Sequence, residues 1–452
     1  MKIVIVGDGK VGYRLAKQLS EENYDVVLID NNAGKLKEAI NKLDIFCITG
    51  DGVSAEIQKE AGVPDAELVI ACTATDEMNM LICLIAKRLG AKNTIARIRN
   101  PIYYEQLDIL KEDLKLSMAI NPELTVANEI ARVLIFPSAS KVETFVKGKV
   151  ELVEVLLREE NPIVGMSLAE VYKKLQIKIL VCAVQRGKEV FIPDGSFELK
   201  AGDRLHVASS HQQLELFFNA LGTKKKAIQK VIIAGGGRVG FYLAKQLCSM
   251  GMHVKIIEES RKKSEYLCEQ LPKATIIHGD ATDHDLLVEE GIDQADAFVA
   301  LTGLDEENII VSLFAKAQGV GKIVAKVNED SRVQMVESLG LDSLVSAKTA
   351  TADAIIGYVR ARQNSYSSAN VETMYRLVDD RVEALEFIIK VNADYTNVAL
   401  KDMRIKPNNL IACIVRNRQI IIPSGNDWLQ PGDSVVVVTR DKKVQDIRDI
   451  LV

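Results

Sequence analysis

The chain has 452 residues, of which 48% are hydrophobic and 26% are charged, and its mean hydropathy is +0.06. This composition is ordinary for packed globular domains and excludes disordered, collagen-like and mucin-like chains, while the length predicts roughly three or four domains. The formal net charge of -5 gives an acidic surface, which argues against binding to the phosphate backbone of nucleic acids.

The sequence predicts neither a membrane span nor a secretory leader. The strongest apolar segment, residues 78–86, ends at Lys87 and Arg88 and is far shorter than the ~18 residues that a bilayer requires. The N-terminus leads directly into a buried-strand pattern at 3–6 instead of a signal peptide. The seven cysteines form no C-x-x-C pair, which is typical of reduced, structural thiols in a cytosolic protein.

Residues 1–135 alternate short β-branched runs with helical patterns. The runs predict strands at 3–6, 25–29, 45–48, 68–71, 94–98 and, more weakly, 118–120. Amphipathic patterns predict helices near 10–22, 33–42, 54–61, 77–89 and 102–113, and a last one that opens at Asn121-Pro122-Glu123 and reaches about 135. Six strands joined by helical crossovers predict a doubly wound parallel sheet, the Rossmann type of α/β fold.

The residues after 135 have a different composition and pattern. Residues 136–149 contain Pro137, several small residues and Gly148, and we interpret them as a linker. Apolar runs at 153–157 and 180–184 then indicate a small α+β domain in which strands dominate, and the basic stretch 224–226 is interpreted as a joint.

The same order then occurs a second time. Gly7-Asp8-Gly9-Lys10-Val11-Gly12 (the first glycine loop) has a counterpart about 228 positions further on in Gly235-Gly236-Gly237-Arg238-Val239-Gly240 (the second glycine loop). One nearly constant displacement along the chain indicates duplicated domains and not a solenoid. We therefore expect Rossmann domains at 1–135 and 229–362, each followed by a small α+β domain, at 150–222 and 372–452, with a second linker near 365–370.

Each glycine loop follows a strand and opens a helix, the context in which G-x-G-x-x-G binds a dinucleotide. The first glycine permits a tight turn, the second lets the backbone approach a pyrophosphate, and the third lets helix and strand pack closely. The helix N-terminus then faces the phosphates. Lys10 and Arg238 follow the middle glycines and either reach a phosphate or stay in solvent. Asp8 opposes phosphate binding unless its carboxylate turns outward, whereas the second loop has Gly236 there.

An acid stands 18 residues after the last glycine of each loop, at the tip of the second strand. These acids are Asp30 and Glu258. A carboxylate at this place suits ribose hydroxyls and repels a 2′-phosphate, so the sequence favours NAD(H) or a simple adenine nucleotide over NADP.

Further candidates follow the third, fourth and fifth strands of each repeat, namely Asp51 and Asp280, Thr73 and Thr302, and Arg97 and Lys326. The aspartates fit either an adenosine contact or a plain turn. The threonines are expected near phosphates or nicotinamide, and the cations bind phosphate or form surface ion pairs. Asp76 and Asp305 are interpreted as N-caps of the fourth helices.

Catalytic groups are not predicted. Residues 1–150 contain no histidine, and the chain has no G-x-S-x-G, no Walker lysine motif and no His/Cys metal spacing. No general acid or base recurs beside the nicotinamide end, so we expect neither catalytic residues nor a metal site. A nucleotide site without such groups indicates a sensor, in which binding moves domains. An NAD-dependent oxidoreductase is the alternative.

Several motifs carry a family resemblance over essentially the whole chain. They are Val4 to Gly12, Gly50-Asp51-Gly52, Ala96-Arg97-Ile98-Arg99, Asn121-Pro122-Glu123, and the signatures at 192–195 with 202–203 and at 422–425 with 432–433. Together they resemble the TrkA family, which consists of tandem RCK modules (regulators of K⁺ conductance). The departures are Asp8, Glu258 in place of aspartate, and Asn328 where the first repeat has Arg99.

The resemblance implies a peripheral protein on the cytoplasmic face of the membrane, in a ring of RCK modules beneath a TrkH-like potassium channel subunit. It implies NAD(H) and ATP or ADP as ligands, nucleotide-dependent gating of potassium flow, and a homotetramer with an eight-module ring. Cyclic di-AMP, a ligand of some related RCK proteins, is an open additional possibility.

Overall fold

The computed structural model describes residues 1–145, 150–222, 227–329, 343–366, 371–377, 381–417, 419–441 and 446–452, together with 332, 336, 339–341 and 444. The chain forms two compact units, one made of residues 1–127 with 346–356 and the other of 128–345 with 357–452. The predicted joint at 224–226 and part of the predicted linker near 365–370 lie outside the described residues.

The first unit contains a six-stranded sheet in the order β3-β2-β1-β4-β5-β6, in which all neighbouring strands are parallel. Its strands are β1 (Lys2–Val6), β2 (Asp25–Asp30), β3 (Phe46–Thr49), β4 (Leu68–Ala71), β5 (Asn93–Arg97) and β6 (Met118–Ile120). Ile3, Val4 and Ile5 are fully buried, because helices cover both faces of the sheet and both kinds of side chain point into apolar layers.

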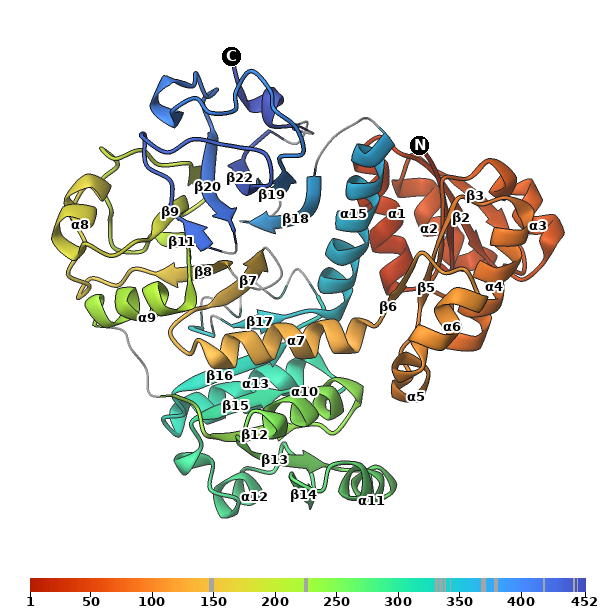
Figure 1. Cartoon of the computed structure of the whole chain (residues 1–452). Helices are drawn as coiled ribbons and strands as arrows, with labels where there is room; N and C mark the ends of the chain where they lie inside the picture. Colours follow the sequence, from red (N-terminus) through yellow and green to blue (C-terminus); the bar gives the residue numbers. More distant parts are fainter. Residues whose placement is uncertain are drawn as a thin grey trace. The chain divides into compact units, whose positions relative to one another are not determined.

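The helices between these strands are α1 (Lys10–Glu21), α2 (Ala33–Lys42), α3 (Ala55–Glu60), α4 (Asp76–Leu89), α5 (Pro101–Glu105), α6 (Leu107–Asp113) and α7 (Pro122–Ile135), with a short turn η1 (Val63–Asp65). Helices α1 and α2 flank one side of the sheet and α3 and α4 the other (Figure 1). The single helix predicted at 102–113 is broken: the Gln106 N–H bonds to the carbonyl of Tyr103, so the α-helical ladder ends there.

The second unit repeats the architecture with the sheet order β14-β13-β12-β15-β16-β17, again with parallel neighbours. The strands are β12 (Lys230–Ala234), β13 (His253–Glu258), β14 (Thr275–His278), β15 (Ala297–Ala300), β16 (Lys322–Lys326) and β17 (Leu344–Val345). The helices are α10 (Arg238–Ser249), α11 (Arg261–Gln270), α12 (His284–Glu289) and α13 (Asp305–Ala317), with the turn η2 (Ile292–Gln294). Helix α15 (Ala347–Tyr366) follows, with residues 347–356 in the first unit and the rest in the second. The predicted pair of doubly wound sheets is therefore confirmed.

Two small antiparallel sheets also belong to the second unit, and both have the same strand order. The first, β10-β9-β11-β8-β7, is built from β7 (Lys141–Phe145), β8 (Val150–Leu156), β9 (Leu180–Arg186), β10 (Glu189–Phe191) and β11 (Arg204–Ser209), with helices α8 (Leu168–Leu175) and α9 (His211–Ala220). The second, β18-β19-β22-β20-β21, is built from β18 (Val371–Leu377), β19 (Val382–Ile388), β20 (Asn409–Arg416), β21 (Gln419–Ile421) and β22 (Ser434–Thr439), with turns η3 (Leu400–Asp402) and η4 (Ile447–Ile450).

Strand β7 corrects the sequence analysis, which interpreted residues 136–149 as a linker. Residues 141–145 pair antiparallel with β8 and complete the sheet. Because Pro137 and Gly148 lie nearby, the local sequence pattern indicates a linker. These residues form a strand because they pair with β8.

The two small sheets share one apolar core. A single buried cluster takes Cys182 and Ala183 from β9 together with Ala412 and Cys413 from β20. In each sheet a buried aspartate binds an arginine through two parallel hydrogen bonds: Arg186 to Asp203 at 2.7 and 2.8 Å, and Arg416 to Asp433 at 2.9 and 2.8 Å. Both aspartates follow a glycine, so the duplicated Gly-Asp signature is structural.

Three further observations concern the surface and the thiols. All seven cysteines are free.

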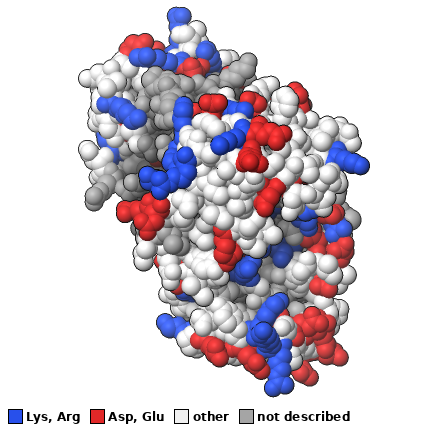
Figure 2. Space-filling model, turned by 90° about the vertical axis from the view of Figure 1, so that its right-hand side faces the viewer, with Lys and Arg blue, Asp and Glu red and all other residues white. Residues whose placement is uncertain are grey.

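Among the described helices, none combines the length and apolar character that a bilayer crossing requires. On the face drawn in Figure 2, basic and acidic side chains are intermixed, so neither sign of charge dominates that face.

Candidate nucleotide-binding sites

The predicted site residues of each repeat meet at one edge of a sheet. The carboxyl ends of parallel strands lie on the same side, so the glycine loop after β1 and the residues that end β2, β4 and β5 share that edge. In the second unit the same edge carries the loop after β12 and the ends of β13, β15 and β16. Two equivalent candidate sites result.

The outer glycines of both loops are required by the protein itself. Gly7 has a φ of 108°, and a Cβ there would lie 2.9 Å from the carbonyl oxygen of Cys72. A Cβ on Gly12 would lie 1.9 Å from the carbonyl oxygen of Gly7. Gly235 and Gly240 repeat this, with 2.7 Å to the Leu301 oxygen and 2.3 Å to the Gly235 oxygen. No side chain fits at these four positions without displacing backbone.

The middle glycines differ in kind. Gly9 and Gly237 have φ values of -83° and -65°, which any residue adopts, and a Cβ on either would meet no described atom within 4 Å. Each is the N-cap of its helix, α1 or α10, and supplies no side-chain cap. The fold has no need of a glycine here. The close approach of a ligand to the backbone and to the free N–H groups of the helix does account for it.

The acids at the ends of β2 and β13 hold the glycine loops. One Asp30 oxygen accepts the backbone N–H of Asp8 at 2.7 Å, and the other accepts that of Asn32 at 2.8 Å. Glu258 does the same with Gly236 and Ser260, both at 2.9 Å. Each carboxylate oxygen has a second lone pair, so the acids can still accept hydrogen bonds from ribose hydroxyls.

The cations after the middle glycines begin the helices. Lys10 and Arg238 are exposed first residues of α1 and α10, and neither makes an ion pair with a described residue. Val11 and Val239, which follow them, are each 8% exposed and anchor the helix starts to the domain. The charged groups are thus free to approach an anion beside the loop.

Asp51 and Asp280 are engaged locally. Asp51 accepts the N–H of Val53 at 3.0 Å, and Asp280 accepts the N–H and the hydroxyl of Thr282, both at 2.8 Å. These contacts stay within the turn, so each aspartate has a local role in its turn.

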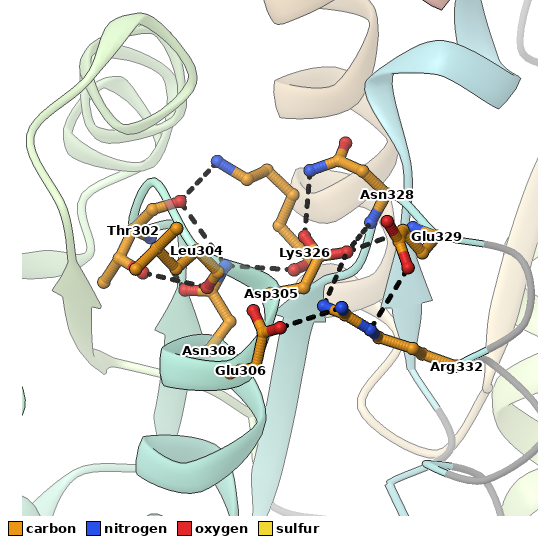
Figure 3. Close-up of polar contacts among 9 residues, drawn as sticks. All are labelled: Thr302, Leu304, Asp305, Glu306, Asn308, Lys326, Asn328, Glu329 and Arg332. Carbon is orange, nitrogen blue, oxygen red and sulfur yellow. Dashed lines mark hydrogen bonds and ion pairs between the residues drawn. The ribbon is translucent and has the colours of Figure 1, made fainter.

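An asparagine that the sequence analysis gave no role connects the other residues. In the second domain the Asn308 amide oxygen accepts the Thr302 N–H at 2.7 Å, and its amide nitrogen donates to the Lys326 carbonyl at 3.0 Å (Figure 3). The Lys326 ammonium returns to the Thr302 carbonyl at 2.7 Å. The ends of β15 and β16 are thereby fixed to each other.

The first domain contains the same bridge with different side chains. Asn79 accepts from the N–H and the hydroxyl of Thr73, both at 2.7 Å, and donates to the Arg97 carbonyl at 2.9 Å. The Arg97 guanidinium donates to the Thr73 carbonyl, and burial lowers the pKa of Arg97. Repetition of Asn79 as Asn308 was the sequence signal that could have identified this bridge.

The predicted capping role of Asp76 and Asp305 is wrong by one position. Thr75 and Leu304 are the N-caps, and the aspartates are the first helical residues. Asp76 accepts the N–H groups of Arg99 and Asn100 at 2.8 and 2.7 Å, which ties α4 to the segment after β5. The Asp76 side chain therefore bonds to a distant segment of the chain instead of capping its own helix.

The equivalent Asp305 accepts the N–H groups of Asn328 and Glu329 at 2.8 and 3.0 Å. Arg332 closes this side by pairing with Glu306 at 2.8 Å and Glu329 at 3.3 Å (Figure 3). In the first domain an ion pair between Arg99 and Glu123 stands near this place. The two edges thus share their main-chain contacts and differ in their charged side chains.

A Rossmann sheet with a G-x-G-x-x-G loop and an acid at the end of its second strand defines a dinucleotide-binding fold, and this chain has two of them, each followed by a small domain built on a five-stranded antiparallel sheet. Residues 3–122 and 231–347 match the TrkA-N domain, and residues 152–222 and 384–452 match the TrkA-C domain. The chain belongs to the TrkA family of Trk system potassium uptake proteins.

Relatives match along their full length. The Trk system potassium uptake protein TrkA homolog of Archaeoglobus fulgidus is 32% identical over 450 residues, which covers 100% of both chains. TrkA of Vibrio alginolyticus is 32% identical over 447 residues, covering 98% of this chain and 96% of that protein. TrkA of Haemophilus influenzae is 30% identical over 450 residues, with the same coverage of 98% and 96%.

Solved structures share the fold. The GsuK RCK domain superposes with a TM-score of 0.64 at 18% identity and covers 98% of this chain and 92% of its own. The GsuK channel bound to NAD gives a TM-score of 0.63 at 18% identity, covering 98% of this chain and 77% of its own. The superpositions show that the chain has the RCK fold, and at this low sequence identity they show the fold alone.

Proposed function

We propose that this chain is a nucleotide-binding regulatory subunit of a Trk-type potassium uptake system, without catalytic activity of its own. The ligands are NAD(H), ATP or ADP. Binding at the two glycine loops changes the geometry of a ring of RCK modules, and that change gates a TrkH-like channel subunit at the cytoplasmic face of the membrane. By the family resemblance the ring is a homotetramer. The functional domains span 1–135, 150–222, 229–362 and 372–452.

The middle glycines carry this proposal. The backbone conformation and the surroundings of Gly9 and Gly237 admit any side chain, yet both repeats have glycine there, beside free helix N–H groups. A pyrophosphate that approaches the backbone supplies the missing reason. Solved structures with the same fold include GsuK bound to NAD and GsuK bound to ADP, which supports this class of ligand.

The remaining site residues have distinct proposed roles. Asp30 and Glu258 accept hydrogen bonds from ribose hydroxyls, and Lys10 and Arg238 neutralise phosphate charge. The other proposed contacts are Asp51 and Asp280 toward adenosine, and Thr73 with Arg97 and Thr302 with Lys326 toward the far phosphate. Among the described residues no histidine or cysteine recurs in both sites as a candidate general base, and the recurring acids Asp30 and Glu258 hold loop N–H groups, so the sites favour binding over chemistry.

The test of the site uses Gly9→Val and Gly237→Val in the full chain. Each variant places a side chain where the ligand phosphate belongs, and neither adds a contact within the protein at its Cβ. Calorimetric titration with NAD, NADH, ADP and ATP is expected to show one nucleotide site lost per substitution, with unchanged circular dichroism. Gly195→Val, in a turn where the nearest atom to a Cβ lies at 3.8 Å, is the control. Unaltered stoichiometry in both variants would contradict the assignment.

The test of the regulatory role measures potassium flux. A TrkH-like subunit is reconstituted in liposomes with the parent chain or with the doubly substituted Gly9→Val, Gly237→Val chain. Nucleotide is expected to change flux only with the parent, since the variant assembles but does not respond. Failure of the chain to co-purify with that subunit, or equal responses of both chains, would contradict the proposal.

A further inference from the structure

The first glycine loop contains a carboxylate that is buried beside another carboxylate. Asp8 is 8% exposed, and its Oδ1 atom accepts no hydrogen bond from any residue of the described ranges. Its own backbone N–H donates to Asp30, so the two acids are adjacent. A buried carboxylate oxygen without a hydrogen-bonding partner is costly, which calls for a reason to keep it.

The charged and titratable neighbours of Asp8 come from several elements. Asp30 ends β2, Lys35 and Glu38 lie on α2, Cys47 lies on β3, and Cys72 follows β4. Burial first, and then Asp30 and Glu38, raise the pKa of Asp8, while Lys35 lowers it. The surroundings therefore favour a neutral Asp8 more than water does.

The second loop fills the same space with hydrocarbon. A Cβ on Gly236 would lie 2.4 Å from the Cδ1 atom of Leu267 and 3.1 Å from the carboxylate of Glu258. Leu267 is 1% exposed and occupies on α11 the position that Ala39, fully buried, has on α2. The pair Asp8 and Ala39 thus replaces the pair Gly236 and Leu267. The smaller residue on α2 goes with the larger residue in the loop, and the exchange adds one acid only to the first site.

We propose that Asp8 links nucleotide binding at the first glycine loop to the uptake of a proton, a link that the second loop lacks because Gly236 stands in place of the acid. This inference rests on the proposed function. A pyrophosphate at the first loop brings negative charge toward Asp8 and Asp30, and one proton from solvent on Asp8 removes the repulsion. The neutral carboxyl then donates a hydrogen bond, to Asp30 or to the ligand, that the carboxylate cannot donate.

The direction of the effect follows from linkage. Because the complex holds the proton more tightly than the free site does, affinity at the first loop rises as the pH falls. For a single proton the slope is at most about tenfold per pH unit, and it is greatest where Asp8 is ionised in the free chain and protonated in the complex. The second loop has Gly236 in place of Asp8, so it lacks the acid that gives this slope.

The experiment isolates each loop in the full chain. Gly237→Val silences the second loop, and NAD is titrated calorimetrically from pH 5.5 to 8.5 in two buffers of different ionisation enthalpy. NAD is the probe because its pyrophosphate does not titrate in this range. We expect affinity to rise as the pH falls, with proton uptake approaching one per NAD bound.

Two variants in that background then remove the acid. D8G/A39L installs the arrangement of the second loop, and Asp8→Asn keeps the shape of the side chain in case the double variant folds poorly. Both are expected to abolish the pH slope and the proton uptake. The reciprocal G236D/L267A, in a chain silenced by Gly9→Val, is expected to acquire them.

The outcomes separate the two hypotheses. A first loop whose NAD affinity is independent of pH, or a slope that Asp8→Asn leaves unchanged, overturns the proton link and leaves nucleotide binding intact. Absence of NAD binding at either loop over the whole pH range overturns the proposed function itself, and the proton link with it.

Discussion

The two halves of the chain have the same strand orders and the same main-chain hydrogen bonds but different charged side chains. Both acids hold their loops through the same N–H group, and both asparagines bridge the fourth and fifth strands. Asp8 and Arg97 of the first half correspond to Gly236 and Lys326 of the second. Both halves keep the contacts that build the nucleotide-binding edge and a cation at the end of the fifth strand, whereas the acid Asp8 has the uncharged Gly236 as its counterpart.

Substitution of the glycines that build the loops should give the largest loss of stability, and the loss should occur in both halves. Gly12→Ala and Gly240→Ala place a Cβ 1.9 and 2.3 Å from a backbone oxygen. We expect each to destabilise its own Rossmann domain by more than about 3 kcal/mol, measured by urea unfolding, with the greater loss for Gly12. The control Gly9→Ala should cost less than about 1 kcal/mol. Native-like unfolding of both glycine variants would contradict the close packing.

Removal of the buried ion pair from either small domain should also cost a similar amount of stability in the two halves. Asp203 and Asp433 are fully buried, so Arg186→Met or Arg416→Met leaves a carboxylate without its countercharge. The expected cost is about 3–5 kcal/mol in each case. Lys42→Met, which removes an exposed pair with Glu38 at 2.8 Å, is the matched control and should cost less than about 0.5 kcal/mol. Equal unfolding midpoints for all three would refute this distinction.

The acids at the ribose position test whether the halves have the same cofactor preference. Asp30→Asn and Glu258→Gln keep side-chain size and remove the charge that repels a 2′-phosphate. Each should weaken the preference for NAD over NADP by roughly tenfold at its own site, measured as a ratio of dissociation constants. A parent chain that prefers NADP would contradict the proposed role of both acids.

The smallest expected effect concerns stability and pH, and here the halves should differ. The pKa of Asp8 is raised from its ordinary value of 3.8 in the folded chain, chiefly by burial. The folded state therefore binds the proton more tightly than the unfolded state, and stability falls as the pH rises from about 3.8 through the raised pKa. Asp8→Asn should gain less than about 1 kcal/mol at pH 7 and nothing at pH 3, by thermal unfolding. A gain of the same size at both pH values would exclude ionisation as its cause.

Local patterns predicted most of the Rossmann architecture. The apolar runs at 3–6 and 68–71 correspond to β1 and β4, and the first glycine loop opens α1 as expected. Such strands are buried on both faces, so their sequence is continuously apolar and needs no knowledge of partners. The duplication then made the second half predictable from the first.

Other features depended on residues far apart in the chain. Strand β7 became a strand through its pairing with β8, and Asp76 accepts N–H groups from 23 and 24 residues away instead of capping its helix. The shared core of the small domains joins β9 to β20. The spacing of apolar residues shows which face of a segment is buried, but it does not show which other segment packs against that face.

By itself, the sequence determined the duplicated domain order, the glycine loops and the acids after the second strands, because each depends on neighbouring residues along the chain. Only the tertiary structure decided that the outer glycines serve packing while the middle ones leave the backbone open. It also decided that a Cβ at Gly236, the counterpart of Asp8, would meet Leu267, whereas the smaller Ala39 stands at the equivalent position of the first half. Both results depend on volume and hydrogen bonding between segments that the fold alone brings together.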